Sequence, residues 1–202
     1  PPKNANENSA AEKLSGNLRP KILLMGGGLG LLPKKLDFYR QLNNLVPAKI
    51  TLITGKNEKL FHQLYHRFEN IEVLGYVRDI ENYFLRSDLV ITKPGGITTF
   101  EAIFSETPIL ALNPTMHQEK YNAEFITKHK IGQTLFLENN LKDAERIAEL
   151  IQNTALINQY KQHMKLMKKS FAACTMTTLI GEVTAAFPLG GALHNEIFSF
   201  NF

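Results

Sequence analysis

Residues 21–30, with the sequence KILLMGGGLG, join an apolar run of strand length to a cluster of glycines. A short apolar run that ends in a turn signal is typical of a strand buried on both faces. Glycines directly after such a strand let the backbone enter a tight loop, because they carry no β-carbon. The segment therefore predicts a buried strand followed by a close-fitting loop.

The same alternation continues through residue 170. Five further runs have the length and composition of strands: 50–54, 71–74, 88–92, 108–112 and 133–136. Helical-length segments separate or follow them: 33–43, 58–68, 80–85, 98–105, 118–129, 141–152 and 154–170. Strands that alternate with helices form βαβ units around a parallel sheet. We therefore predict an α/β fold: a doubly wound, Rossmann-like parallel sheet of about six strands with helices on both faces.

The composition of the 202 residues is that of a globular protein, because 44% are hydrophobic and 21% charged, which excludes wholesale disorder and fibrous repeats. A net charge of +4 favours an anionic ligand or surface but is too small to indicate nucleic acid, so no nucleic-acid partner is expected. The single cysteine cannot form an internal disulfide, which fits a reducing, cytoplasmic compartment. No uninterrupted apolar stretch reaches the roughly 18 residues of a transmembrane helix.

Composition also divides the chain into three parts. Residues 1–19 are polar and are predicted to be a linker or tail. Residues 20–172 form the domain of strands and helices. Residues 173–202 are apolar and rich in threonine, and we expect a helix near 176–183 followed by an apolar tail.

Glycines follow two of the predicted strands, at residues 26–30 and, after Pro94, at Gly95 and Gly96. Ligands of open α/β sheets bind beyond the carboxyl ends of the strands. A loop without side chains exposes backbone amides, and the start of a helix adds about half a positive charge. Two such loops in one sheet favour a phosphate-bearing ligand, and the structural alternative is that the glycines only permit tight turns.

The motifs of dinucleotide binding and ATP hydrolysis are absent. In the pattern G-x-G-x-x-G the third glycine would fall on Leu31 or Pro33, and G-x-x-x-x-G-K-[ST] does not occur. The four aspartates form no D-x-D pair, and His62 and His66, spaced to share one helical face, have no third ligand. No metal and no other cofactor is therefore expected.

Three linked motifs resemble the donor-binding half of glycosyltransferase family 28, whose members pair two Rossmann-like domains in the GT-B arrangement. They are GGGLG at 26–30, KPGGITTFEA at 93–102 and QEKYNA at 118–123. The resemblance covers residues 20–137, and the chain looks most like the diacylglycerol glucosyltransferases and monogalactosyldiacylglycerol synthases. Met116 and His117 stand where lipid-glycosylating relatives usually have Pro-Gly, so the resemblance leaves the sugar open.

The resemblance implies that these motifs bind a UDP-sugar. Gly28, Leu29 and Gly30 would approach the donor phosphates and sugar, and Gly95, Gly96, Thr98 and Thr99 would hold the diphosphate. Backbone groups of Val77 and Arg78 would contact the uracil, Glu101 the ribose hydroxyls, and Gln118, Glu119 and Asn122 the sugar and the adjoining pocket wall.

Several of these residues also have a structural interpretation that the sequence leaves open. Thr98-x-x-Glu101 is the pattern of a capping box, in which the glutamate bonds the first amides of a helix. Gln118 and Glu119 would be favourable in the first turn of a helix without touching any ligand.

The implied reaction is the inverting transfer of a hexose from a UDP-sugar to a lipid such as diacylglycerol. The resemblance places the lipid acceptor and the general base on an N-terminal domain or a partner chain, so the isolated chain is expected to bind the donor without turnover. Backbone amides and a helix dipole would stabilise the departing UDP without a metal.

The implied location is cytoplasmic and peripheral to the membrane. The basic run Lys161, Lys165, Lys168 and Lys169, with His163, is of a kind that is usually a solvated helix face and less often a contact for anionic lipids. Three alternatives stay open: a non-catalytic nucleotide-binding regulatory domain, a peptidoglycan-precursor GlcNAc transferase and a sugar-nucleotide epimerase.

Overall fold

A computed structural model describes residues 19–173 of the chain. The chain divides into two compact units after Lys165, and the sheet with its covering helices belongs to the first. The predicted linker before residue 19 and the predicted helix near 176–183 lie outside the described residues.

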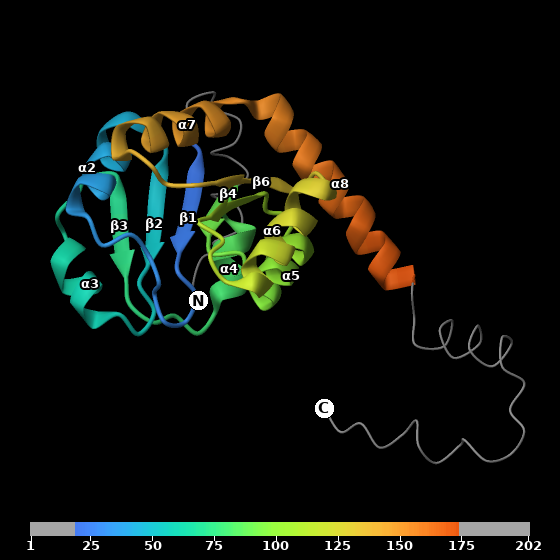
Figure 1. Ribbon diagram of the computed structural model, residues 1–202, viewed down its shortest axis with the longest axis horizontal. Helices are drawn as coiled ribbons and strands as arrows, with labels where there is room; N and C mark the ends of the chain where they lie inside the picture. Colours follow the sequence, from blue (N-terminus) through green and yellow to red (C-terminus); the bar gives the residue numbers. More distant parts are fainter. Residues whose placement is uncertain (1–18, 174–202) are drawn as a thin grey trace, which may run out of the picture. The chain divides into compact units, whose positions relative to one another are not determined.

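Six strands form one sheet: β1 (Lys21–Met25), β2 (Lys49–Ile53), β3 (Ile71–Leu74), β4 (Leu89–Thr92), β5 (Ile109–Leu112) and β6 (Gly132–Leu135). The helices between and after them are α2 (Leu36–Leu45), α3 (Glu58–Leu64), α4 (Ile80–Leu85), α5 (Gly96–Phe104), α6 (His117–Lys128), α7 (Asn140–Gln152) and α8 (Thr154–Ala173). All neighbouring strands pair in parallel, in the order β3-β2-β1-β4-β5-β6 (Figure 1).

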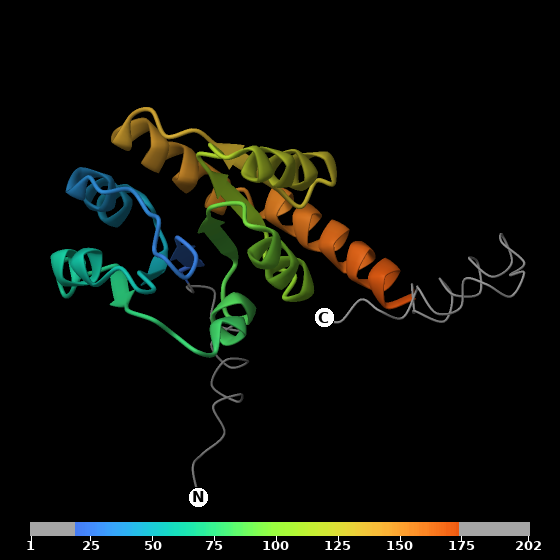
Figure 2. The ribbon, with the colours of Figure 1, turned by 60° about the horizontal axis from the view of Figure 1, so that its bottom comes forward.

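The order of the strands reverses between β1 and β4, so the sheet is doubly wound. Because parallel crossovers are right-handed, α2 and α3 cover one face, and the helices that follow β3 on the way to β6 cover the other (Figure 2). The helix α7 then returns to the first face and packs against α2 (Figure 1). The predicted Rossmann-like fold is confirmed.

The core occupies both faces of the sheet. Leu24 and Leu52 belong to a buried cluster that includes Leu42 of α2 and Ile147 of α7. Successive side chains of a strand point to opposite faces, and Leu23 is fully buried on the side of α5 and α6. The near-continuous apolar strands of the sequence are thus explained by burial on both sides.

Most of the helices begin or end a few residues away from the predicted positions, and three of these differences concern motifs discussed above. The helix α2 begins at Leu36 because Pro33 still belongs to the preceding loop, where its carbonyl accepts a hydrogen bond from the Tyr39 hydroxyl at 2.6 Å. The helix α3 ends at Leu64, and His66 has a φ of +52°, so His62 and His66 do not share a helical face. The helix α5 begins at Gly96, two residues earlier than predicted.

The part of α8 up to Lys165, which belongs to the same compact unit as the sheet, makes polar contacts with segments next to the strands. Lys161 forms an ion pair with Asp88, just before β4, at 3.3 Å, and one ring nitrogen of His163 lies 2.9 Å from the Lys130 carbonyl oxygen. One member of the predicted basic run is therefore paired with a carboxylate. Among residues 19–173, no helix has the length and apolar character needed to cross a membrane.

Candidate functional site

The two glycine loops lie side by side at the carboxyl edge of the sheet. The last residues of β1 and β4, Met25 and Thr92, are register partners, so the loops that follow them start at the same level. This edge is also the point at which the strand order reverses. The sequence predicted this juxtaposition, and it is where ligands of doubly wound sheets bind.

The loop after β1 divides into a packed part and an open part. Gly30 has a φ of +61°, and a β-carbon on it would overlap the carbonyl oxygen of Thr54. Asn57 adds to this packing, because its side-chain amide donates to the Gly30 carbonyl at 3.1 Å. A β-carbon on Gly28 would meet no described atom within 4 Å, and Leu29 is 68% exposed. Gly28 and Leu29 thus face open space, whereas Gly30 supports the loop from within.

The loop from Lys93 to Gly95 has every carbonyl engaged by a donor of the protein. The Lys93 carbonyl accepts the Gly95 amide at 2.8 Å, and the Pro94 carbonyl accepts the side-chain amide of Asn122 at 2.8 Å. The Gly95 carbonyl accepts both the amide and the hydroxyl of Thr99, at 2.9 and 2.8 Å. The loop therefore turns its partial negative charges toward the protein.

The amides at the start of α5 are arranged in the opposite way. The first amides of any helix have no intrahelical partner, and those of Gly96, Ile97 and Thr98 bond no other described residue. A β-carbon on Gly96 would also meet nothing described within 4 Å. The nine-residue helix α5 thus presents free donors and its positive dipole end to open space, which suits an anion.

Thr98 and Thr99 are placed differently. Thr98 is half-buried near the helix start, whereas Thr99 is 5% exposed and has both its amide and its hydroxyl bonded to Gly95. Thr99 therefore anchors the loop, and its predicted contact with a diphosphate stays a prediction.

Glu101 does not cap α5, so the capping-box alternative is wrong. The N-cap is Gly95, which makes Thr98 the third helical residue and places Glu101 in the second turn. The Glu101 carboxyl is half-buried, and its pKa is raised by burial and by the nearby carboxylate of Glu81 on α4. A half-buried carboxylate outside any cap is suited to accept hydrogen bonds from a ligand.

Glu119, in contrast, has the structural role that the sequence left open. Its Oε2 accepts the amides of Thr115 and Met116 at 2.8 and 3.2 Å and the ammonium of Lys93 at 3.4 Å. Partial burial alone would raise the pKa of Glu119, but the two amide hydrogen bonds and Lys93 outweigh it and lower the pKa. Glu119 and Asn122 therefore fasten α6 to neighbouring loops, while Gln118 is exposed.

Val77 and Arg78 lie between β3 and α4, in the segment that runs past the carboxyl ends of the strands (Figure 1). Val77 is half-buried and Arg78 exposed. Neither backbone amide has a hydrogen-bond partner among residues 19–173. Both are thus available for the predicted backbone contacts with a base.

Sequence reasoning missed the roles of Lys93 and Asn57. Lys93 directly follows the fully buried strand β4, and its side chain is only 23% exposed. A lysine next to such an apolar run signals a charge that needs a partner, because buried charges are paired. Asn57 caps α3 through the Leu60 amide while it holds Gly30, a double role with no motif of its own.

In the described part of the chain, no three His, Cys, Asp or Glu side chains gather as metal ligands. The expectation of a metal-free reaction is not tested by this observation and stays a prediction.

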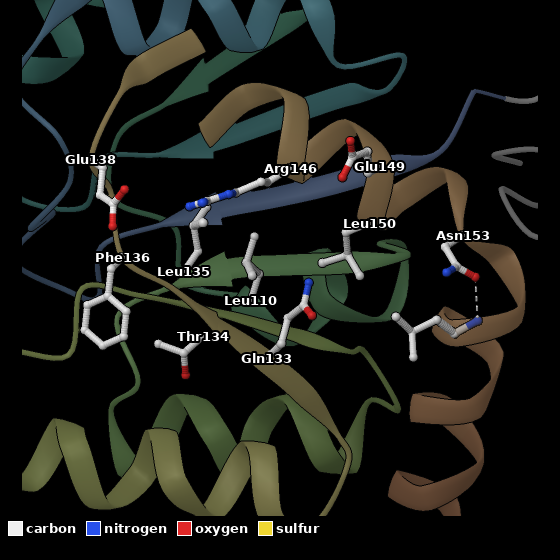
Figure 3. Close-up of a pocket in the computed structure, with 11 residues that line it drawn as sticks. Leu110, Gln133, Thr134, Leu135, Phe136, Glu138, Arg146, Glu149, Leu150 and Asn153 are labelled. Carbon is white, nitrogen blue, oxygen red and sulfur yellow. Dashed lines mark hydrogen bonds between the residues drawn. The ribbon is translucent and has the colours of Figure 1, made fainter. Parts of the chain in front are cut away.

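A cavity of about 460 Å³ lies between α7 and the strands β5 and β6 (Figure 3). Arg146, Glu149 and Leu150 extend from α7, and Gln133 and Thr134 from β6 (Figure 3). None of the predicted donor residues lines it. Two carboxylates, Glu138 and Glu149, accompany the single guanidinium of Arg146, so the cavity is unsuited to a diphosphate.

Residues 29–179 match the model of the glycosyltransferase family 28 C-terminal domain, which is more than half of the chain. The chain belongs to glycosyltransferase family 28. The processive diacylglycerol β-glucosyltransferase of Bacillus pumilus (strain SAFR-032) is 29% identical over 167 residues, covering 81% of this chain and 43% of the relative. The enzyme of the same name from Staphylococcus saprophyticus is 33% identical over 119 residues, covering 57% and 30%. The family 28 domain thus spans less than half the length of these relatives.

Solved structures agree on the fold of this family 28 domain. MurG of Acinetobacter baumannii matches with a TM-score of 0.63 and 19% identity over 78% of this chain and 48% of its own. The glycosyltransferase VinC, solved in complex with dTDP, matches with a TM-score of 0.63 and 18% identity over 83% and 41%. These structures are GT-B glycosyltransferases, and the chain has the fold of one of their two Rossmann-like domains.

Proposed function

We propose that this domain binds a UDP-sugar at the carboxyl edge of β1 and β4 and supplies it for hexosyl transfer to a lipid. Membership in glycosyltransferase family 28 supports the class of reaction. Relatives named processive diacylglycerol β-glucosyltransferases support a hexose donor and a diacylglycerol-type acceptor. The acceptor and the general base are assigned to the part of such enzymes that this chain does not match.

The backbone arrangement around the start of α5 carries this proposal. The carbonyls of Lys93, Pro94 and Gly95 are bonded inward, and the first amides of α5 face open space. A diphosphate placed there meets several N–H donors and the positive end of a helix without facing a carbonyl oxygen. Gly28 and Leu29 lie on the adjoining loop and would border the phosphates and the sugar.

The nucleoside is assigned to the side of α4. The Glu101 carboxylate would accept hydrogen bonds from the two ribose hydroxyls, a pairing that suits an acceptor-only group. The free backbone groups of Val77 and Arg78 would bond the edge of the uracil. Backbone recognition of this kind selects a base by its pattern of donors and acceptors.

The sugar is assigned to the start of α6. Gln118 is exposed there and can both donate and accept, as recognition of sugar hydroxyls requires. Glu119 and Asn122 would form the wall behind it, since Glu119 Oε2 and the Asn122 amide nitrogen are engaged within the protein.

The reaction would be a single displacement at the anomeric carbon. The acceptor hydroxyl attacks, the bond from the anomeric carbon to the diphosphate oxygen breaks with its electron pair, and UDP departs as configuration inverts. A general base outside this chain would take the acceptor proton. Helix α5 would stabilise the charge that develops on the leaving diphosphate, so no metal is assigned to this step.

Calorimetry with UDP, UDP-glucose, UDP-galactose and UDP-GlcNAc tests the proposal on the 202-residue chain. We expect UDP to bind and one of the three UDP-sugars to bind more tightly than UDP. Gln118→Ala should abolish this difference in affinity, and Gln152→Ala, at an exposed position on α7, serves as the control. UDP binding that is indifferent to the sugar and to Gln118 would favour the regulatory alternative. Absence of UDP binding would refute the donor site itself.

An enzyme that glycosylates a membrane lipid must act at the membrane surface. We propose peripheral association of the longer enzyme at the cytoplasmic face, supported by the names of the relatives. Co-sedimentation with vesicles that contain diacylglycerol tests it, and an enzyme that stays in the supernatant would contradict it.

A further inference from the structure

We propose that Lys93, Glu119 and Asn122 are positioning residues that hold the β4–α5 loop in the orientation needed for diphosphate binding. The identity of the ligand rests on the function proposed above. The geometry of the loop does not, because it follows from contacts within the protein.

Asn122 controls the middle of the loop. Its side-chain amide donates to the Pro94 carbonyl at 2.8 Å across 28 residues of sequence, in a part-buried position. Pro94 has no amide hydrogen, so its carbonyl is the single backbone polar group that it offers. Without Asn122 this carbonyl would lack a partner and would be free to rotate toward the ligand, where it would repel a diphosphate.

Lys93 controls the start of the loop. Its ammonium donates to the Asn113 carbonyl at 2.5 Å and to Glu119 Oε2 at 3.4 Å. Asn113 follows β5 and is itself fixed, because its Oδ1 accepts the Leu137 amide at 2.7 Å. Lys93 therefore ties the end of β4 to two neighbouring segments of the same sheet edge.

Glu119 completes the support from the side of α6. The same carboxylate oxygen that meets Lys93 accepts the amides of Thr115 and Met116, so it fixes the start of α6. Asn122 lies almost one turn further along that helix. Two side chains of α6 thus hold two consecutive residues of the loop, and a shift of α6 would move the amides of α5.

The test uses Asn122→Leu, which keeps the size of the side chain and removes its donor. Asn70→Leu is a matched control, because the Asn70 side-chain amide donates to the Asn43 carbonyl at 3.0 Å across 27 residues. Asn70 directly precedes β3, at the opposite edge of the sheet from the donor site. Each variant loses one side-chain-to-carbonyl hydrogen bond, and Asn70→Leu also loses the exposed bond that Arg19 donates to Asn70 Oδ1 at 3.0 Å. Asn70→Leu should therefore lower the melting temperature at least as much as Asn122→Leu does.

Only Asn122→Leu is expected to weaken UDP binding, by about tenfold, while uridine binding changes less than about twofold. It should also shift the amide NMR resonances of Gly96 and Ile97 in the free protein, which Asn70→Leu should leave in place. Equal losses of UDP affinity in the two variants, or unmoved resonances in Asn122→Leu, would overturn the proposal.

Lys93→Met is a second variant, for use if Asn122→Leu does not fold, and it removes the contacts of Lys93 with Asn113 and Glu119. It should likewise weaken UDP binding more than uridine binding and shift the amide resonances of Gly96 and Ile97. The resonances of Gly96 and Ile97 separate the two proposals. If the wild-type chain binds no UDP, the function fails, yet the resonances still report whether these residues position the loop.

Discussion

The α-carbon of Gly30 lies so close to the carbonyl oxygen of Thr54 that no β-carbon fits between them. This contact joins the loop after β1 to the end of β2, and the positive φ of Gly30 reinforces the need for glycine. Gly96, by contrast, borders space that no described atom fills. Of these two glycines of the candidate site, Gly30 is required by the packing of the loop, whereas Gly96 is the one proposed to border the ligand.

Alanine substitutions should separate these two roles. Gly30→Ala should lower the free energy of unfolding by about 2 kcal/mol or more, because it adds a clash and a strained φ. Gly96→Ala should leave stability within about 0.5 kcal/mol, since its φ is ordinary, and should weaken UDP binding by filling ligand space. Urea unfolding and calorimetry measure the two effects, and a Gly96→Ala protein with wild-type UDP affinity would contradict the assignment.

The Glu101 carboxyl should make UDP affinity depend on pH. Its pKa is raised by burial and by Glu81. In the free domain the carboxyl therefore becomes protonated at a pH higher than the ordinary glutamate pKa of about 4.3. Ribose hydroxyls donate to the ionised form, and affinity should therefore fall as the pH falls through this raised pKa.

Two variants isolate this effect from the titration of the ligand's own phosphate. Glu101→Gln should bind UDP weakly, and its UDP affinity should not show the fall with decreasing pH that is due to protonation of Glu101. Glu81→Gln removes the neighbouring charge and should move the loss of affinity to lower pH. Parallel pH profiles for the wild type and Glu101→Gln would show that this carboxylate does not meet the ligand.

The Glu119 carboxylate should stabilise the fold in a pH-dependent way. Its pKa is lowered, so its contribution is present above the unfolded-state pKa of about 4.3 and is lost as the pH falls through the lower folded-state value. Glu119→Gln should cost about 1–2 kcal/mol at pH 7 and less below pH ~4. Thermal unfolding of Glu119→Gln between about pH 3 and pH 7 measures this loss of stability, with Glu124→Gln at an exposed position as the control. A loss that does not vary with pH would show that the ionised Glu119 carboxylate is not its source.

UDP binding should not require a metal ion. Helix α5 and the loop amides supply the positive potential, so EDTA should change the UDP dissociation constant by less than about twofold. A loss of affinity with EDTA that Mg²⁺ or Mn²⁺ restores would show that the site uses a cation.

The sheet could be predicted from sequence because its strands are nearly continuous apolar runs bounded by glycine, proline or aspartate. The predicted strands at 21–25 and 71–74 coincide with β1 and β3, and the other four differ from the structure by one residue at one or both ends. Helix starts were harder, because Pro33 and Thr98 both carry the signals of a helix beginning. The N-cap of α5 is Gly95 and not a residue next to Thr98, and glycine has no side chain that a capping pattern could identify.

The predicted site residues share one edge of the sheet, but the sequence could not divide them by role. Glu101 and Glu119 both stand early in a helix after a turn, and their patterns are nearly alike. Only the packing distinguishes them: Glu119 is met by two amides and Lys93, whereas Glu101 faces another carboxylate. Such contacts join segments far apart in sequence, which periodicity and motifs do not encode.

The binding of UDP at the carboxyl edge between β1 and β4 is the central claim, and amide NMR of the ¹⁵N-labelled chain tests it most directly. On addition of UDP, we expect the largest shifts at Gly28, Leu29 and residues 96–101, with smaller ones at Val77 and Arg78. The residues of the cavity beside α7 should stay unchanged. Shifts confined to that cavity, or none at millimolar UDP, would contradict the account.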